Sequence, residues 1–264
     1  MRQKRIGCLP VLMAISLIVI LVIGWIYYKD GKTYTDLKTE VTYKKKEIKN
    51  KKKDDGYRIN WKALKNKDVV AWIRFKHPKI ISYPVMQKND NDFYLHKNIK
   101  KEYSFAGSIF MDYHNNKDFS DSNTLIYGHN MANGSMFGSL KKYTEKSYWA
   151  KNKYFYIYTR DGKRRKYKIY NICMVRPGSE IYTYRFASEK SIKDYIEYYQ
   201  SFGEYPTGIN GQGLLMIIIL NTLHMDIIKQ YIFLLQIRIL ARVIMMYCIS
   251  ILTTQNLQKK IKKK

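Results

Sequence analysis

Apolar residues dominate the start of the chain and then give way to charge. Residues 6–28 contain no charged side chain, and Arg2, Lys4 and Arg5 precede them. About twenty apolar residues are enough to cross a bilayer as a helix. The run ends in Gly-Trp-Ile-Tyr-Tyr, whose aromatic residues suit a membrane interface, whereas a cleaved signal peptide has a shorter apolar core and a small-residue cleavage motif. We therefore expect residues 1–5 in the cytoplasm, an uncleaved anchor over 6–28, and the rest of the chain outside.

A polar and strongly basic segment follows the predicted anchor. Residues 29–56 are mostly polar or charged, with a spacing compatible with a solvated helix or a stalk. We place the boundary of a folded domain near Asp55-Gly56. The chain of 264 residues is long enough for one well-packed domain besides an anchor and this stalk.

Short apolar runs separated by turn residues fill the predicted domain. The runs are rich in β-branched and aromatic residues, and turns such as Asp161-Gly162 divide them, which predicts β-strands. Many short strands with turns between them indicate a sandwich or a barrel. The expected strands are residues 69–75, 80–85, 107–112, 124–129, 154–158 and 165–170.

Two helices are expected among these strands. Residues 61–64 have the pattern of a short helix. A longer one begins after Ser188, a plausible N-cap, and its apolar residues recur at helical spacing as far as Phe202. This second helix should pack on the strands.

Charge and cysteine content narrow the function classes. Lys and Arg number 48 against 21 acidic residues, a formal charge of +27, which makes nucleic acid, anionic lipid and anionic wall polymer all conceivable neighbours. Much of the excess lies in the stalk and in the last six residues, and an exported domain meets little nucleic acid, so no nucleic-acid partner is expected. Cys8, Cys173 and Cys248 have neither disulfide nor zinc-ligand spacing. With no phosphate-binding or metal-binding motif, no cofactor is expected.

One histidine stands out by its position. A buried strand ends in Gly128-His129, where the sheet can hold the imidazole while it faces a cleft. Because the unperturbed pKa of histidine lies near neutrality, such a residue suits general acid or base work. The alternative is a hydrogen-bonded structural histidine. His77, His96 and His114 are scattered along the chain, and we interpret them as surface or structural residues.

The block around His129 resembles a known motif. Residues 125–140, LIYGHNMANGSMFGSL, are similar to the catalytic-histidine motif of class B sortases, the cysteine transpeptidases that join surface proteins to the cell envelope. Three upstream blocks fit the same family in the same order, and the resemblance covers roughly residues 57–222. These blocks are DVVAWI at 68–73, YPVMQ at 83–87 with DFYL at 92–95, and GSIFMDY at 107–113. The resemblance implies a closed sortase-like β-barrel with a few peripheral helices, preceded by one transmembrane helix.

The resemblance also implies a chemistry. His129 would be the general acid that protonates a departing amine and then the base that activates an incoming one. In the family, a cysteine thiolate after a threonine attacks the threonine carbonyl of a sorting signal and forms a thioester acyl-enzyme, and an arginine on the next strand steadies the oxyanion. The partners implied are a sorting-signal peptide and an amine on peptidoglycan or a pilin. Asp112 and Asn130 are candidates for shaping the cleft, without an assigned role.

The chain departs from the family pattern at the nucleophile. Residues 214–222 match the penultimate strand, but Leu223 occupies the position of the expected cysteine, and an alkyl side chain is no nucleophile. Residues 227–251 are unusually rich in Ile, Leu and Met and lack the turn residues expected between the last two strands, so we interpret 223–264 as an aberrant tail. Arg242 is a candidate for the oxyanion arginine, although it falls later after Thr222 than expected. Cys173 is interpreted as a buried apolar residue, and Cys248 lies in the tail.

A single lost base explains this departure. If Thr222 to Met225 are written with AT-rich codons as ACT-TTA-CAT-ATG, one G restored after the first T of the leucine codon gives ACT-TGT-ACA-TAT, which reads Thr-Cys-Thr-Tyr. The hypothesis is a one-base deletion in the gene or in its sequencing, with an inactive chain as the result. The alternative is a true pseudoenzyme that binds sorting peptides at the cell surface without cutting them.

Overall fold

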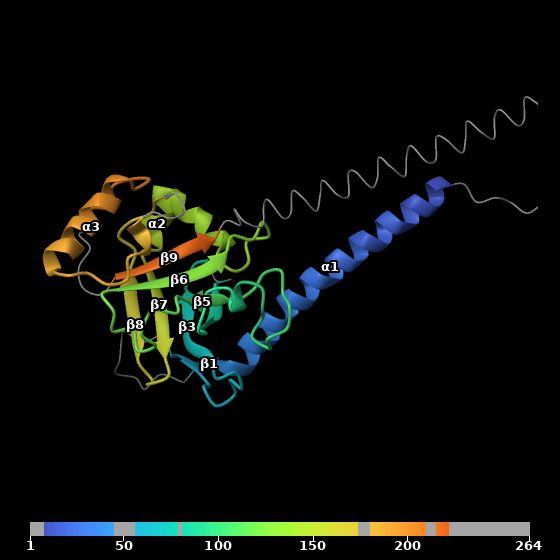
Figure 1. Ribbon diagram of the computed structural model, residues 1–264, viewed down its shortest axis with the longest axis horizontal. Coiled ribbons are helices and arrows are strands. Elements are labelled where there is room, and N and C mark those ends of the chain that lie inside the picture. The colour runs from blue at the N-terminus through green and yellow to red at the C-terminus, as the bar shows by residue number, and fades with distance from the viewer. Residues whose placement is uncertain (1–7, 45–55, 79–80, 174–179, 210–214, 222–264) are drawn as a thin grey trace, which may run out of the picture. The chain divides into compact units, whose positions relative to one another are not determined.

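The computed structural model describes residues 8–44, 56–78, 81–173, 180–209 and 215–221 (Figure 1). The chain divides into two compact units, and the larger comprises Ile26–Thr222. Of the other unit, only residues 8–25 are described. The predicted tail at 223–264, with Leu223, Arg242 and Cys248, lies outside the described residues.

A single long helix, α1, covers Cys8–Val41. The large apolar side chains between residues 13 and 28 are mostly exposed, and the helix is long and apolar enough to cross a membrane, with a mean hydropathy of 1.7 in its most apolar window. An N-terminal signal sequence would show the same features. The apolar helix predicted from the sequence is therefore present.

The predicted stalk differs from what the structure shows. Of the two expected forms, a solvated helix or a stalk, residues 29–41 form a helix that continues α1. This helix is docked rather than solvated, because Tyr34 and Val41 are buried in the core of the larger unit. Strand β1, Thr42–Lys44, then pairs antiparallel with β2, Tyr57–Ile59. Most charged residues of this helical segment are exposed, whereas Asp30 is buried together with Tyr34 and Val41.

Seven strands form the main sheet, in the order β8-β7-β3-β4-β5-β6-β9. The β4–β5 and β6–β9 pairs are parallel and the others antiparallel. The bounds are β3 Val69–Phe75, β4 Ser82–Met86, β5 Ile109–Met111, β6 Asn123–His129, β7 Tyr154–Thr159, β8 Arg164–Lys168 and β9 Leu215–Asn221.

The sheet carries apolar clusters on both faces of its central strands. Successive side chains of a strand point to opposite faces. Accordingly Ile73 and Ile109 belong to one buried cluster, whereas Trp72 and Phe110 belong to another. All four side chains are less than 5% exposed. This alternation explains why the central strands were predictable from their apolar and aromatic composition.

The helices are short except for α1 and α3. The longer helix predicted after Ser188 is present as α3, Glu189–Ser201, and Ser188 forms a capping box with Ser191. Tyr195 and Tyr199 of α3 are buried, and Tyr195 donates a hydrogen bond of 2.8 Å to the Ile181 carbonyl. The remaining helices are η1 Phe93–Leu95, η2 Gly138–Thr144, α2 Lys146–Lys151 and η3 Glu180–Tyr182.

One expectation of the fold is wrong, and another is confirmed only in part. Residues 61–64 form a turn rather than a helix, because their backbone makes only the short-range bonds from Ala63 N to the Asn60 carbonyl and from Leu64 N to the Trp61 carbonyl. The closed barrel is not seen within the described residues, where β8 and β9 each pair with a single neighbour and form the two edges of the sheet.

Candidate active site

The strand register places His129 beside the end of β9. His129 is the last residue of β6, and the parallel pairing sets it opposite Asn221, the last residue of β9. Figure 1 shows β9 in orange running alongside β6 in green. Residue 223, where the cysteine was expected, follows Asn221 by two positions in the sequence. The strand end singled out from the sequence thus adjoins the histidine.

The imidazole of His129 is buried and held by the backbone. His129 is only 2% exposed, and its Nε2 lies 2.8 Å from the carbonyl oxygen of Leu95, the last residue of η1. A carbonyl oxygen only accepts, so Nε2 carries the hydrogen of this bond. The ring of His96 lies with its centroid 6.0 Å from that of His129, and Tyr103 stacks on His96 at 6.4 Å.

A buried carboxylate lies directly after β5, the strand that pairs with β6. Asp112 follows β5 and is 5% exposed. Its Oδ2 accepts hydrogen bonds from Tyr127 Oη at 2.7 Å and Asn91 Nδ2 at 2.8 Å, and its Oδ1 lies 2.8 Å from His114 Nδ1. Burial alone would raise the pKa of Asp112, but these donors and the His114 backbone N–H lower it below the ordinary value. The carboxylate therefore stays ionised and fixes three side chains.

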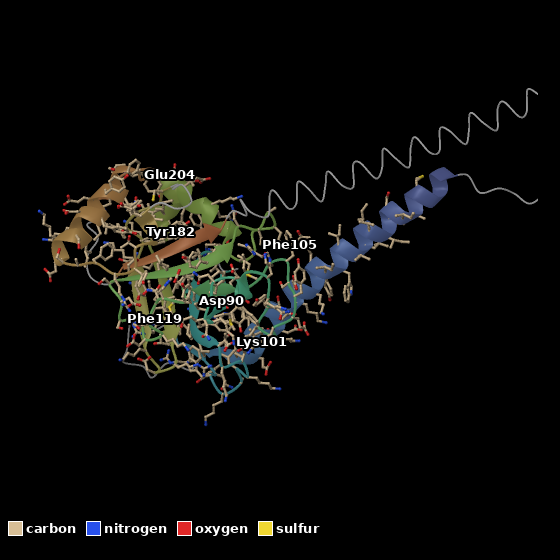
Figure 2. The ribbon with its side chains drawn as sticks, viewed as in Figure 1. Asp90, Lys101, Phe105, Phe119, Tyr182 and Glu204 are labelled. Atoms are coloured by element: carbon tan, nitrogen blue, oxygen red, sulfur yellow. The ribbon has the colours of Figure 1, made fainter. Side chains whose placement is uncertain are left out.

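Tyr127 links this network to the strand of His129. The two residues are two positions apart on β6, so their side chains lie on the same face of the sheet. Tyr127 stacks on Tyr182 with ring centroids 6.5 Å apart, and His114 stacks on Tyr184 at 4.9 Å. Figure 2 labels Tyr182 in this region.

A hollow of about 370 Å³ adjoins these rings. Its lining is polar and aromatic and comes from one short segment of the chain: Glu180, Tyr182, Thr183, Tyr184 and Arg185. Because two of the lining tyrosines stack on Tyr127 and His114, the hollow borders the same face of the sheet as His129. One of its lining residues, Thr183, accepts a hydrogen bond of 2.7 Å from Asn123 Nδ2, at the opposite end of β6 from His129.

The other residues considered from the sequence fall elsewhere. Cys173 is partly buried against the α3 cluster, and burial, followed by the charge of Glu204, raises the pKa of its thiol. A thiol with a raised pKa is a poor nucleophile, which supports the packing interpretation. Asn130 forms a backbone bridge to Met136, directly after His129. Within the described residues, no three His, Cys, Asp or Glu side chains gather as a metal site.

Sequence reasoning missed the neighbours of His129. His96 was interpreted as surface or structural, yet it lies beside the candidate catalytic ring. His114 has a structural role, as expected, in the hydrogen-bond network around Asp112. The period-two alternation along β6 could have placed Tyr127 on the face of His129, but no sequence signal joins that strand to His114 or to η1.

Known proteins with similar sequences settle the family. The sortase domain matches residues 77–196. Sortase B of Listeria monocytogenes is 35% identical over 159 residues, 60% of this chain and 63% of that protein. Sortase B of Staphylococcus aureus is 32% identical over 176 residues, 64% of this chain and 68% of that protein. The chain belongs to the sortase B family.

A solved sortase B structure confirms the fold. Sortase B from Bacillus anthracis, in complex with AAEK1, superposes with a TM-score of 0.60 at 28% identity, covering 71% of this chain and 86% of that one. The described part of the chain therefore has the sortase fold. His129 lies inside the matched sortase range, whereas β9 lies beyond it. The match spans under two thirds of the length of the Listeria relative.

Proposed function

We propose that the chain derives from a membrane-anchored sortase transpeptidase. Such an enzyme cleaves a C-terminal sorting signal at threonine and links the surface protein to an amine on peptidoglycan or a pilin. The observation that carries the proposal is the β6–β9 register, which sets His129 opposite Asn221, two residues before the position of the expected nucleophile. Strands after Thr222 would complete the barrel beyond β9.

The proposed reaction assigns one proton transfer to His129 in each half. A cysteine thiolate at position 223 attacks the threonine carbonyl carbon, and the tetrahedral intermediate collapses to a thioester as the C–N bond breaks. The imidazolium of His129 gives its proton to the departing amine and later takes one from the acceptor amine, whose attack releases the thiolate. Since Leu95 accepts from Nε2, Nδ1 is the ring nitrogen that exchanges this proton. Arg242, the candidate for steadying the oxyanion, is read in the same frame as Leu223, so it has no assigned role in the frame-restored reaction.

Leu223 leaves this chain without a nucleophile, so we propose that the chain as written is inactive. Reading the genomic DNA across codons 220–226 decides between a sequencing error and a real change. An extra G in the leucine codon would restore Thr-Cys-Thr-Tyr and the reading frame beyond it. A DNA sequence without that G would end the sequencing-error version.

Activity tests the enzymatic role directly. We expect the frame-restored protein to cleave a fluorogenic sorting peptide, whereas the chain as written does not. In the restored protein, His129→Ala should lower the cleavage rate by roughly a hundredfold or more, the usual scale of general acid–base catalysis. His77→Ala is the matched control, since His77 is not on β6 but two residues after the end of β3, and it should leave the rate unchanged. Undiminished cleavage by His129→Ala would contradict the assigned role.

The second candidate function is a peptide-binding pseudoenzyme. It is favoured by Leu223 together with the aromatic hollow at Tyr182 and Tyr184, which is intact without the nucleophile. The chain as written should then bind a sorting peptide without reacting with thiol reagents at position 223, and Tyr182→Ala should weaken binding. Tyr154→Ala, on β7 and outside the hollow, is the control. Equal weakening by both variants, or no measurable binding, would contradict this candidate.

A further inference from the structure

One face of α1 contacts the loop that follows η1, at residues 104–108. Tyr27, Asp30 and Tyr34 recur at helical spacing and lie on one face of the helix. Tyr27 meets Phe105 edge-on, with ring centroids 5.8 Å apart (Figure 2 labels Phe105). Asp30 Oδ2 accepts a hydrogen bond of 2.8 Å from Ser104 Oγ. All of these residues belong to the larger compact unit.

Tyr34 makes the deepest of these contacts. Its side chain is buried, and its hydroxyl lies 2.8 Å from the Gly107 carbonyl oxygen and 2.9 Å from Ser108 Oγ. Ser108 Oγ in turn donates to the Lys97 carbonyl at 2.7 Å. Burial raises the pKa of Tyr34, so the phenol keeps its hydrogen and acts as a donor. The two hydroxyls thus supply two hydrogens to two backbone carbonyls of the loop.

The loop at residues 104–108 packs against Leu95. Ser104 N donates to the His96 carbonyl at 3.0 Å and Ser108 N to the Tyr94 carbonyl at 2.9 Å, so bonds hold both neighbours of Leu95. Gly107 has a φ of +55°, and a Cβ there would lie 2.2 Å from the Leu95 carbonyl oxygen. The Gly107 backbone is therefore pressed against the oxygen that accepts from Nε2 of His129.

We propose that Tyr34 and Asp30 are positioning residues, which hold the Leu95 carbonyl against Nε2 of His129 and thereby keep the ring hydrogen on that nitrogen. Neutral imidazole has two tautomers, and the partner of one nitrogen decides which tautomer is present. The catalytic meaning rests on the proposed transpeptidase function, because Nδ1 is then the nitrogen that exchanges the proton. Helix α1 thus sets the tautomer of His129 through two hydrogen bonds, Tyr34 to Gly107 and His129 to Leu95, which are joined by the packing of Gly107 against the Leu95 carbonyl.

The tautomer of His129 provides the test. The full chain, in detergent micelles and labelled with ¹⁵N-histidine, should show His129 with its hydrogen on Nε2, its signals being assigned by their loss in His129→Gln. Tyr34→Phe removes one oxygen and keeps the ring that meets Tyr83 edge-on at 5.5 Å. It should raise the Nδ1–H tautomer and speed exchange of the Nε2 hydrogen with water by roughly fivefold to a hundredfold, the range for leaving one buried carbonyl without its donor.

Two further variants make the outcome decisive. Ser104→Ala removes the hydrogen bond to Asp30 and should shift the His129 tautomer and the exchange rate of its Nε2 hydrogen in the same direction. This variant also tests the proposal if Tyr34→Phe folds poorly. Thr35→Val is the control, because the Thr35 hydroxyl donates to the Gly31 carbonyl within α1 at 3.0 Å, and it should leave His129 unchanged. The proposal is overturned if Tyr34→Phe and Ser104→Ala loosen α1 by hydrogen exchange yet keep the wild-type tautomer and exchange rate. No turnover is measured, so failure of the frame-restored protein to cleave peptide would refute the enzyme function and not this coupling.

Discussion

At the scale of single residues, Asp112 shows how a charge is kept inside this fold. A buried carboxylate is costly unless donors replace its water. Asp112 has four: Tyr127 Oη, Asn91 Nδ2, and the backbone and ring nitrogens of His114. These come from three segments of the chain, so the carboxylate ties β5, β6 and the loop after β4 together on the face that holds His129.

Replacing Asp112 by Asn should destabilise the protein in a pH-dependent way. The amide loses acceptor capacity and brings a donor toward other donors, so we expect the free energy of unfolding to fall by roughly 1–3 kcal/mol at pH 7. The pKa of Asp112 is lower in the folded than in the unfolded protein, so the charge stabilises fully above the unfolded pKa of about 4 and its contribution is lost as pH falls through the folded pKa.

Urea unfolding at pH 7 and at pH 3, followed by tryptophan fluorescence, measures this effect. The difference between the wild type and Asp112→Asn should narrow at pH 3. Asp194→Asn, on the exposed side of α3, is the control and should change stability by less than about 0.5 kcal/mol. A difference as large at pH 3 as at pH 7 would show that the carboxylate charge is not the stabilising group.

At the scale of elements, α3 begins at a residue that the sequence identifies. The Ser188 hydroxyl accepts from Ser191 N at 3.1 Å, and the Ser188 backbone N–H donates to Ser191 Oγ at 3.0 Å. Both bonds satisfy amide groups that a helix N-terminus otherwise leaves without partners. The start of α3 is therefore fixed locally. Further along the helix, the side chains of Tyr195 and Tyr199 are buried and hold it against the rest of the domain.

Ser188→Ala should fray the first turn of α3. The loss of an N-cap typically costs about 1 kcal/mol, and hydrogen exchange of the amides in residues 189–192 should accelerate accordingly, by roughly fivefold. Ser201→Ala is the matched control at the other end of the same helix, where the hydroxyl donates to the Tyr198 carbonyl. Equal acceleration of the first turn by both variants would rule out a capping role for Ser188.

Elements with a local signal were predictable, and those placed by distant contacts were not. β3 was predicted with its observed bounds, Val69–Phe75, because nearly every side chain in it is apolar or aromatic and buried. A helix over residues 29–41 was one of two expected forms, but its docking was missed because most of its residues are polar. Tyr34 is buried by distant parts of the chain, among them Tyr83 and the loop that contains Gly107 and Ser108. The site followed the same rule: the strand end identified His129, whereas its partner Leu95 required the tertiary fold.

At the scale of the whole molecule, one continuous helix serves two environments. Residues 13–28 of α1 expose large apolar side chains, while Asp30 and Tyr34 are buried in the larger unit. The polar residues that follow Tyr28 would suit the membrane surface, and no separate linker divides the two stretches of helix. We propose that the apolar stretch is a membrane anchor that remains on the mature protein, rather than a cleaved signal sequence.

Two lysines in the apolar stretch should abolish the anchor. Ile18 and Leu21 are 58% and 62% exposed, and a lysine near the centre of a span costs about 2.5–3.5 kcal/mol, so Ile18→Lys with Leu21→Lys opposes insertion by roughly twice that amount. The wild-type protein should stay in the membrane fraction after carbonate extraction, with the intact mass of the uncleaved chain. The double lysine variant should leave that fraction, and the matched pair Ile18→Ala with Leu21→Ala should remain. A mature protein that begins after residue 24 would identify the apolar stretch as a signal sequence, and the anchor would then be wrong even though residues 26–41 stay docked.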